Sequence, residues 1–297
     1  MRSRVVADDD CAIAQAVGVV GDWWTLLIVR DVAGGITRFD ALQEELGVSR
    51  KVLTERLAAL VEAGVLDRRP YSDRPPRFDY VLTAAGRGLL PTLVALQDWG
   101  TRFVMGDGTV TAAGSDTSLE AHRMRRLVGT WVPDVQLSDQ HGRAVDVVDE
   151  NGWSVVYCFP GGYPPRSQAT PAGWAAIPGA AGCTLESATF REHADAFAAA
   201  GATVHGVSSQ RPDELDAFAR SAGLAFPLLS DEDNVLAAAL RLPTFRAAGT
   251  LRLKRLTLVV DPDRTIRAVQ YPIDDPAQSV VDALAVVIEL ARAGRPA

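Results

Sequence analysis

The stretch Ile177-Pro-Gly-Ala-Ala-Gly-Cys183-Thr-Leu-Glu186 stands directly before a helical run over residues 187–200. A cysteine at the first turn of a helix lies where backbone N–H groups and the helix dipole favour its thiolate. Because the thiolate is the nucleophile of thiol chemistry, this stretch predicts a reactive thiol at Cys183.

Strand-like and helical runs alternate on both sides of Cys183. The strand candidates are residues 154–159, 203–208, 256–261 and 266–271. The helix candidates between them are residues 187–200, 212–222, 234–240 and 277–293. Strands separated by helices of this length indicate an α/β fold in which helices cover both faces of a sheet.

The first hundred residues follow a different pattern. Residues 12–30 are apolar with helical spacing, and residues 38–46 predict a short amphipathic helix that Gly47 closes. Ser49 is typical of an N-cap and begins a further helix that ends at Glu62. The helix over residues 38–46 and the helix that Ser49 begins are the two helices of a predicted helix-turn-helix.

Two strand-like runs follow, residues 65–69 and 78–82, and the residues between them include two adjacent prolines that suit an exposed loop. Thr83 caps a last helix that runs to about Phe103. Helix, turn, helix and hairpin together predict an α+β winged helix-turn-helix. In that arrangement the second helix enters the major groove of DNA and the hairpin touches the backbone.

Residues 104–117 are rich in Gly, Thr, Ala and Ser and lack periodicity, which predicts a flexible linker. The fold class we expect is therefore two domains. An α+β winged helix-turn-helix covers residues 1–103, and an α/β domain covers residues 118–297 and begins with a basic helix at residues 118–128.

The composition is that of an ordinary globular protein, with 297 residues, 47% of them hydrophobic and 23% charged. No apolar run approaches the roughly 18–20 residues of a membrane span, so we expect a cytoplasmic protein without membrane contact. A net charge of −7 disfavours nonspecific binding to nucleic acid, but a DNA-binding module needs only one basic face.

A set of residues in the first domain carries a family resemblance: Cys11, Gly21-Asp-Trp-Trp24, Arg38-Phe39, Gly47-Val-Ser49, Arg56-Leu57, Tyr71, Pro75, Leu82-Thr83 and Trp99. With them, residues 8–103 resemble the HxlR-type family of winged-helix transcriptional regulators. The resemblance implies a homodimer that binds a palindromic operator in double-stranded DNA. It also implies that Cys11 stands where some members sense oxidants or electrophiles.

A second set lies in the other domain: Gly129-Thr-Trp-Val-Pro133, Tyr157-Cys-Phe-Pro160, Gly182-Cys-Thr184, Glu186, Gly206-Val-Ser208, Leu242-Pro-Thr-Phe245 and Arg255-Leu-Thr-Leu-Val-Val-Asp261. This domain looks like a peroxiredoxin of the thioredoxin-like fold, nearest the Q-type and redoxin branch. The resemblance implies a hydroperoxide substrate and a catalytic set of Cys183, Thr184, Glu186 and Arg255. Cys183 would attack the peroxide and become a sulfenic acid, while Arg255 would hold the thiolate and the peroxide.

Two positions depart from the peroxiredoxin pattern. Ala180 stands where the family carries a Thr or Ser that orients the peroxide, and the loss of one such hydrogen bond lowers a rate by about 10²–10³. Ala188 stands where many Q-type members have a resolving cysteine. The resolving thiol is therefore Cys158, Cys11 or an external reductant, either thioredoxin-like or of low molecular weight. The stretch 161–177 is also longer than in most peroxiredoxins.

Three cysteines are too few for a secreted disulfide framework. Cys158 alternates with aromatic residues in a predicted strand, which indicates a core position first and a resolving role second. For Cys11, sensing and packing stay equal alternatives. The histidines and cysteines show no metal-ligand spacing, and Gly161-Gly162 is too weak to indicate a nucleotide-binding loop, so we expect neither metal nor cofactor.

Polar residues around the second helix and the hairpin are the DNA contacts that the winged-helix arrangement predicts: Arg38, Ser49, Arg50, Lys51, Arg56, Arg74 and Arg77. Ser49 and Arg50 stand at a helix N-terminus, where base edges are reached. The arginines of the hairpin are expected to bind phosphates. The alternative is that the basic helix residues only face solvent.

We interpret the chain as a redox-linked transcriptional regulator whose second domain reacts with peroxide through Cys183. One alternative is a thiol peroxidase, with one or two working cysteines, whose winged helix serves for dimerisation or localisation. Another is a peroxiredoxin-like domain that is catalytically weak and acts as a scaffold, which Ala180 and Ala188 favour.

Overall fold

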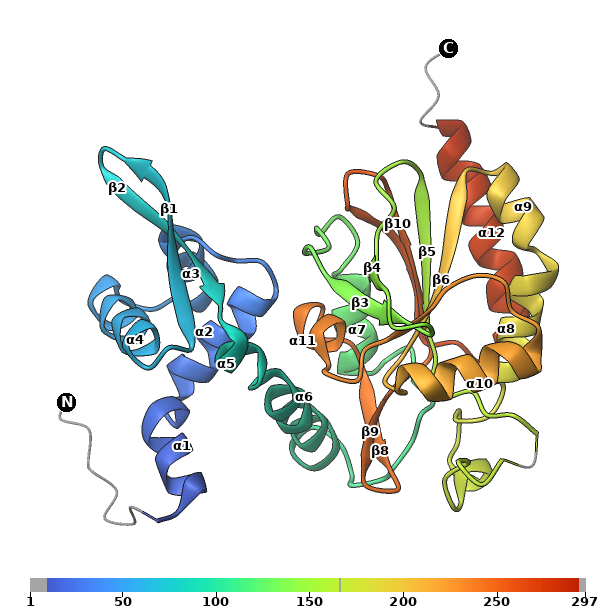
Figure 1. Cartoon of the computed structure of the whole chain (residues 1–297), viewed down its shortest axis with the longest axis horizontal. Helices are drawn as coiled ribbons and strands as arrows, with labels where there is room; N and C mark the ends of the chain where they lie inside the picture. The colour runs from blue at the N-terminus through green and yellow to red at the C-terminus, as the bar shows by residue number, and fades with distance from the viewer. Residues whose placement is uncertain (1–9, 166, 294–297) are drawn as a thin grey trace. The chain divides into compact units, whose positions relative to one another are not determined.

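The computed structural model describes residues 10–165 and 167–293. Its contacts divide the chain into two compact units that meet between Leu93 and Val94, inside helix α6 (Leu90–Trp99) (Figure 1). The first domain predicted from the sequence ends later, at residue 103. Each unit has its own core and is described by itself.

The first unit consists of helices and one hairpin: α1 (Ala12–Val20), α2 (Trp23–Ala33), α3 (Phe39–Leu46), α4 (Arg50–Glu62), β1 (Leu66–Asp73), β2 (Pro76–Leu82) and α5 (Ala84–Arg87). The single helix predicted over residues 12–30 is two helices. Asp22 has an extended backbone, and its carboxylate accepts hydrogen bonds from the N–H groups of Trp24 (3.1 Å) and Thr25 (3.4 Å). Asp22 therefore caps α2 and separates it from α1.

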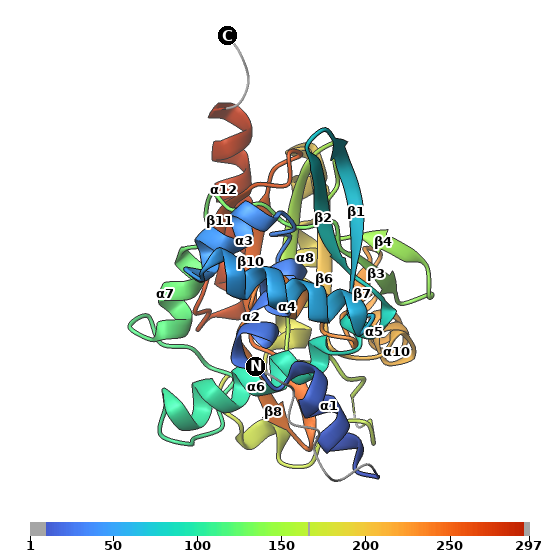
Figure 2. The same ribbon diagram turned by 90° about the vertical axis from the view of Figure 1, so that its left-hand side faces the viewer.

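Helix α4 begins as predicted, since the Oγ of Ser49 accepts a hydrogen bond from the N–H of Val52 at 3.3 Å. Leu53, Leu57 and Leu60 face inward and are fully buried. The two strands extend further than predicted and leave only a short turn between them, so the hairpin is a long twisted ribbon (Figure 2). These elements confirm the helix-turn-helix with a wing.

No single helix among the described residues is long and apolar enough to cross a membrane. Only α1 and α2 taken together pass that test of length and composition, with a bend of 76° between them.

The second unit holds a mixed sheet and its helices. Its helices are the part of α6 from Val94 onward, a π-helix (Gly100–Val104), α7 (Leu119–Arg125), a 3-10 helix (Trp174–Ala176), α8 (Cys183–Glu192), α9 (Ala194–Ala199), α10 (Pro212–Ala222), α11 (Val235–Ala239) and α12 (Pro276–Ala293). Its strands are β3 (Gln136–Asp139), β4 (Ala144–Asp146), β5 (Trp153–Cys158), β6 (Ala202–Ser208), β7 (Leu228–Ser230), β8 (Thr244–Ala247), β9 (Thr250–Leu253), β10 (Leu256–Val260) and β11 (Ile266–Gln270).

Among the described residues the main sheet has the strand order β11-β10-β5-β6-β7-β3-β4. Strands β5, β6 and β7 run parallel, and the other neighbours pair antiparallel. Helices α8, α9, α10 and α12 share one hydrophobic cluster on one face, while α7 and α11 lie on the other face (Figure 1). The predicted α/β class with both faces covered is confirmed.

Five strands were not predicted, namely β3, β4, β7, β8 and β9. Each spans only three or four residues, which is too short for alternation to stand out from the surrounding sequence. Strands β8 and β9 form a separate hairpin outside the main sheet.

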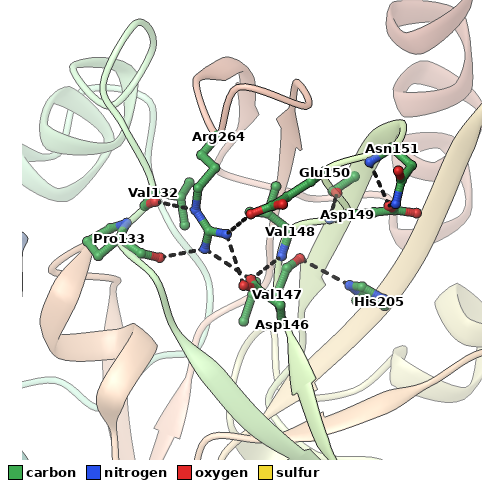
Figure 3. A network of polar contacts seen from close by, with 11 residues as sticks. Val132, Pro133, Asp146, Val147, Val148, Asp149, Glu150, Asn151, His205 and Arg264 are labelled. Carbon is green, nitrogen blue, oxygen red and sulfur yellow. Dashed lines mark hydrogen bonds and ion pairs between the residues drawn. The ribbon is translucent and has the colours of Figure 1, made fainter.

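The guanidinium of Arg264, in the turn between β10 and β11, holds the chain where it enters the sheet (Figure 3). It donates hydrogen bonds to the carbonyl groups of Val132 (3.0 Å) and Pro133 (2.8 Å). It also binds the carboxylate of Asp146 in a bidentate pair at 2.9 and 3.0 Å. Such charge-assisted pairs are strong and directional, so this end of the sheet is firmly tied.

We call residues 105–118, between the π-helix and α7, the connector. The sequence predicts a flexible linker over most of it, at 104–117. In the structure the backbone N–H groups of Ala112 and Ala113 both donate to the carbonyl oxygen of Pro178, at 2.9 and 3.0 Å. Because the contacts come from backbone and small side chains, the composition does not reveal them.

Candidate functional site

Cys183 is the first residue of α8, where the sequence places it. Gly182 before it has a φ of 106°, and a Cβ at this position would stand 2.8 Å from the Cγ of Pro276. Only glycine suits both the backbone angle and the space. The start of α8, and with it the position of the Cys183 sulfur, is therefore fixed by Gly182.

Arg255, just before β10, lies beside the thiol. Its Nη2 is 3.6 Å from the Sγ of Cys183 and donates to the carbonyl oxygen of Ala181 at 2.9 Å. Its Nη1 pairs with the Oε2 of Glu186, one turn further along α8. Arg255 and Glu186 are both buried. The carboxylate of Glu186 therefore holds the guanidinium of Arg255 beside the sulfur, and both charged groups are shielded from solvent.

The electrostatics of the thiol are a balance of opposing effects. Burial raises the pKa of Cys183, and the positive charge of Arg255 opposes that rise. The charge of Glu186 raises the pKa of the thiol further, but burial also raises the pKa of Glu186 itself, to about 7. Below that pH the carboxyl group of Glu186 is protonated and neutral. The positive charge of Arg255 then favours the thiolate without the opposing negative charge of Glu186.

The sulfur is less accessible than the sequence leads one to expect. Cys183 is only 4% exposed, because it packs in the same cluster as Phe159 and Phe190. A peroxide-reactive thiol must meet its substrate, so access depends on motion of the residues around it.

The loop after β5 supplies a backbone donor that the sequence did not reveal. The N–H of Gly161 hydrogen-bonds to Cys183 and lowers the pKa of the thiol. Gln210 holds the next residue from both sides, since its Oε1 accepts from the N–H of Gly162 at 2.7 Å and its Nε2 donates to the carbonyl at 3.0 Å. A Cβ on Gly162 would stand 2.3 Å from the ring of Phe218. Gly161-Gly162 thus belongs to the thiol site.

The described residues of the long stretch 161–177, all except residue 166, pack beside this site. The rings of Tyr163 and Trp174 meet edge to face at 5.5 Å, and Trp174 lies 6.2 Å from Phe245 on β8. Fully buried Ala180 belongs to the same cluster. The added residues therefore form an aromatic wall next to the loop that leads into Cys183.

Cys158 has a different setting. Its neighbours Tyr157 and Phe159 belong to the hydrophobic cluster that contains Cys183. Because successive side chains of a strand point to opposite faces, Cys158 points to the other face of the sheet. Burial and the charge of Asp231 raise its pKa well above the ordinary value. The placement favours a core role over a resolving role.

The remaining predicted residues of the thiol chemistry lie elsewhere. Thr184 is exposed on α8 and does not share the buried setting of Arg255 and Glu186. Cys11 stands at the N-terminal end of α1 in the first unit and is partly buried.

The N-terminus of α4 gathers the predicted DNA contacts of the helix-turn-helix. Ser49, Arg50 and Lys51 are all exposed there. The guanidinium of Arg50 lies 4.7 Å from the centre of the Phe39 ring and 3.4 Å from the carboxylate of Asp40. The exposed pair is weak, so the guanidinium can exchange it for another partner.

Three further arginines of the predicted DNA-binding set are exposed, and a fourth is not. Arg38 precedes α3 and lies 3.5 Å from the carboxylate of Asp79, and Arg74 and Arg77 are exposed in the hairpin. Arg56 is partly buried instead, and its Nη2 pairs with the carboxylate of Asp22 at 3.1 Å. Because Asp22 caps α2, Arg56 links α4 to α2, and this structural contact stands beside the DNA contact that the sequence predicts for it.

The two units together define a class of protein in which a winged helix-turn-helix is joined to a thioredoxin-like domain with a cysteine at a helix start. A sequence profile of the HxlR-like helix-turn-helix family matches residues 19–107, and a profile of the AhpC/TSA family matches residues 175–269. The chain belongs to both: its N-terminal part is an HxlR-like helix-turn-helix domain and its C-terminal part a peroxiredoxin-like domain.

Individual relatives match one part each. An uncharacterised HTH-type transcriptional regulator of Mycobacterium tuberculosis is 44% identical over 93 residues, which make up 31% of this chain and 59% of that protein. A predicted peroxiredoxin of the same organism is 33% identical over 155 residues, 50% of this chain and 86% of that protein. The crystal structure of peroxidoxin BcpB, also from M. tuberculosis, is 28% identical, covers 57% of this chain and 98% of its own, and gives a TM-score of 0.46.

Proposed function

We propose that this chain is a redox-linked transcriptional regulator, which binds an operator through its winged helix and reacts with a hydroperoxide through Cys183. The observation that carries the proposal is the contact between the connector and the loop before Cys183. The carbonyl of Pro178 accepts hydrogen bonds from both Ala112 and Ala113, and a Cβ on Gly179 would overlap Ala113. A rearrangement of this loop therefore acts directly on the connector, which leads back along the chain through the π-helix to α6, the helix in which the two units meet.

The chemical step is a two-electron oxidation of sulfur. The thiolate of Cys183 attacks one oxygen of the hydroperoxide, so that an S–O bond forms while the O–O bond breaks. The other oxygen leaves with the electron pair, takes a proton from solvent and departs as water or an alcohol. Cys183 becomes a sulfenic acid. Arg255 favours the thiolate and never gives up its own proton.

The return step uses an external thiol, thioredoxin-like or of low molecular weight. Cys158 faces the other side of the sheet, so a disulfide between it and Cys183 would have to cross the strand. An external thiol attacks the sulfenic acid to give a mixed disulfide and water, and a second thiol releases Cys183. Because the sulfur is buried, this exchange needs an opening of the loop 178–182, which breaks its hydrogen bonds to the connector.

The chain has two arrangements in this proposal, one with the loop 178–182 closed and one with it open. Oxidation of Cys183 changes operator affinity only if it stabilises one of these arrangements more than the other. The connector contact supports such a difference, since it exists only while the loop is closed. The DNA contacts in the proposal are Ser49, Arg50 and Lys51 on α4, with Arg38, Arg74 and Arg77 beside them.

A homodimer and a palindromic operator are part of the proposal. None of the residues of α1 is buried, although its sequence is almost entirely apolar. Ile13 is 75% exposed and Val17 is 54% exposed. A second copy of the chain would cover these side chains, and a two-fold dimer reads two symmetric half-sites.

The regulatory test compares operator affinity before and after oxidation. The operator is first selected from random duplex DNA with the full chain, and its Kd is then measured for reduced and for peroxide-treated protein. We expect a change of about tenfold or more, which is a coupling of about 1.4 kcal/mol, and no change in Cys183→Ser. Equal affinities in the two redox states would end the regulatory part of the proposal.

The DNA surface is tested by Lys51→Ala with Arg126→Ala as a matched control, since Arg126 is also exposed but lies in the second unit. Lys51→Ala is expected to weaken binding and to reduce the slope of log K against log salt by about 1 if Lys51 neutralises one phosphate. The control should leave both quantities unchanged.

A second candidate function is a thiol peroxidase whose winged helix serves for dimerisation or localisation. It is favoured because Cys183, Arg255 and the N–H of Gly161 already form one site without any contribution from DNA. Rapid peroxide turnover with a thiol reductant, together with a failure to select any DNA sequence, would support this function over the first.

A further inference from the structure

Position 180, three residues before Cys183, carries a methyl group and no hydroxyl. Ala180 is fully buried and packs in a cluster that also includes Trp174, with Tyr163 against it. The site therefore has no side-chain hydroxyl from the loop that leads into α8 at this point.

A hydroxyl group reaches the same region from the added loop. The Oη of Tyr163 lies 3.0 Å from the point where a Cβ on Gly161 would stand. Gly161 is the residue whose N–H hydrogen-bonds to Cys183. The phenol of Tyr163 and the thiol of Cys183 are thus both next to one backbone residue.

The Oη of Tyr163 is buried, and it has no hydrogen-bond partner among residues 10–165 and 167–293. A buried hydroxyl without a partner is unfavourable, so such a group in a folded protein calls for an explanation. Burial raises the pKa of Tyr163 to about 12. The phenol therefore keeps its proton near neutral pH and can act as a hydrogen-bond donor.

A second unpartnered donor belongs to the same aromatic group. Arg252 on β9 is 6% exposed, its guanidinium carbon lies 6.0 Å from the centre of the Trp174 ring, and its Nε has no partner among the described residues. Trp174 also meets the ring of Tyr163 edge to face at 5.5 Å. Two buried donors thus flank one tryptophan, as expected of a place that receives a polar ligand rather than of a purely apolar wall.

We propose that the hydroxyl of Tyr163 orients the hydroperoxide at Cys183, in place of the hydroxyl that position 180 lacks. This inference rests on the proposed peroxide reaction. The O–H of Tyr163 donates a hydrogen bond to the oxygen that leaves, where negative charge develops as the S–O bond forms and the O–O bond breaks. The leaving oxygen still takes its proton from solvent, so Tyr163 remains a neutral phenol.

The test is Tyr163→Phe in the full chain, which removes one oxygen atom and keeps the ring against Trp174. Two second-order rate constants are measured on the peptide that contains Cys183, by mass spectrometry. One is for oxidation by hydrogen peroxide and the other for alkylation by iodoacetamide, which needs the thiolate but no oriented peroxide. Tyr80→Phe in the first unit is the matched control.

We expect Tyr163→Phe to lower the peroxide rate constant by about 10²-fold and to leave the alkylation rate constant within about twofold. An unchanged peroxide rate overturns the inference. An equal fall in both rates also overturns it, because Tyr163 would then act on the thiolate or on the fold. A wild-type chain that is alkylated but inert to peroxide overturns the proposed peroxide reaction and this inference together, whereas a reactive wild type with an equally reactive variant overturns the inference alone.

Discussion

Cys183, at the start of α8, packs against one face of the main sheet, whereas Cys158, in β5, points to the other face, and each is almost fully buried. Burial raises the pKa of both thiols. Their neighbours differ, since Cys183 has the guanidinium of Arg255 and the N–H of Gly161, whereas the charges that act on Cys158 are the carboxylates of Asp231 and Glu186. The comparison teaches that burial by itself does not make a thiol inert, because the sign of the neighbouring charge decides whether the thiolate is tolerated.

The largest expected difference is in the reaction with peroxide. Cys183→Ser should abolish it, because no other described cysteine has a cation beside it. Cys158→Ser should keep the rate of Cys183 oxidation within about twofold if the Cys158 thiol takes no part. Stopped-flow measurement of peroxide consumption checks both variants, and a loss of activity in Cys158→Ser with an intact fold would make the two thiols partners.

The two thiols should also differ in how they become accessible. Opening of the loop before Cys183 exposes one sulfur, while Cys158 in the central strand needs global unfolding. We take the free energy of local opening at Cys183 to be roughly 4 kcal/mol lower than that of global unfolding. Cys183 should then be alkylated about 10³-fold faster than Cys158 in the native state. Dilute urea should accelerate the alkylation of Cys158 and leave that of Cys183 nearly constant. Similar urea dependence for the two would contradict the comparison.

Removal of the Arg255 guanidinium should make the reactivity and the pKa of the Cys183 thiol more like those of Cys158. Arg255→Met is expected to lower the peroxide rate constant by about 10²–10³ and to raise the pKa of the thiol, measured from the pH dependence of alkylation. Arg246→Met, at an exposed arginine in the same unit, is the matched control and should change neither quantity.

The smallest expected effect concerns the carboxyl group beside Cys158. Burial raises the pKa of Asp231 from an ordinary 3.8 to about 7, so the folded chain keeps a proton that the unfolded chain loses over this range. The free energy of unfolding therefore falls as pH rises from about 4 to 7, by on the order of 1–3 kcal/mol, and levels off above. Glu186 adds a fall over a similar range.

Asp231→Asn should make this fall shallower, because only the part due to Glu186 remains. Asp233→Asn, at an exposed neighbouring carboxylate, should keep the full pH dependence. Urea unfolding followed by circular dichroism at several pH values measures both, and a wild-type stability that rises over this range would show that Asp231 is ionised in the folded chain.

The sequence predicted well those features that depend on local pattern. Ser49 and Leu53, Leu57 and Leu60 define α4 through a cap and a helical stripe. The position of Cys183 at a helix start is equally local. The main strands β5, β6, β10 and β11 were likewise predicted from strand-like runs of five to seven residues.

What the sequence could not predict depends on contacts between distant segments. Gly161 meets Cys183 only because the chain that follows the end of β5 lies beside the beginning of α8 in the fold. Arg56 has the spacing of a DNA contact, but Asp22 takes its guanidinium. The unpartnered hydroxyl of Tyr163 is likewise a property of packing, which no pattern of residue types records.

The hydrogen bonds from Ala112 and Ala113 to Pro178 have a practical meaning for anyone who wishes to isolate the thiol domain. A shortened polypeptide that starts at residue 118, where composition suggests a natural cut, would lack both alanines and uncover Trp174 and Ala180. Truncation there would remove one wall of the reactive centre, and low activity in such a fragment would be an artefact of the cut. Expression should begin near Val94, where the compact unit itself begins.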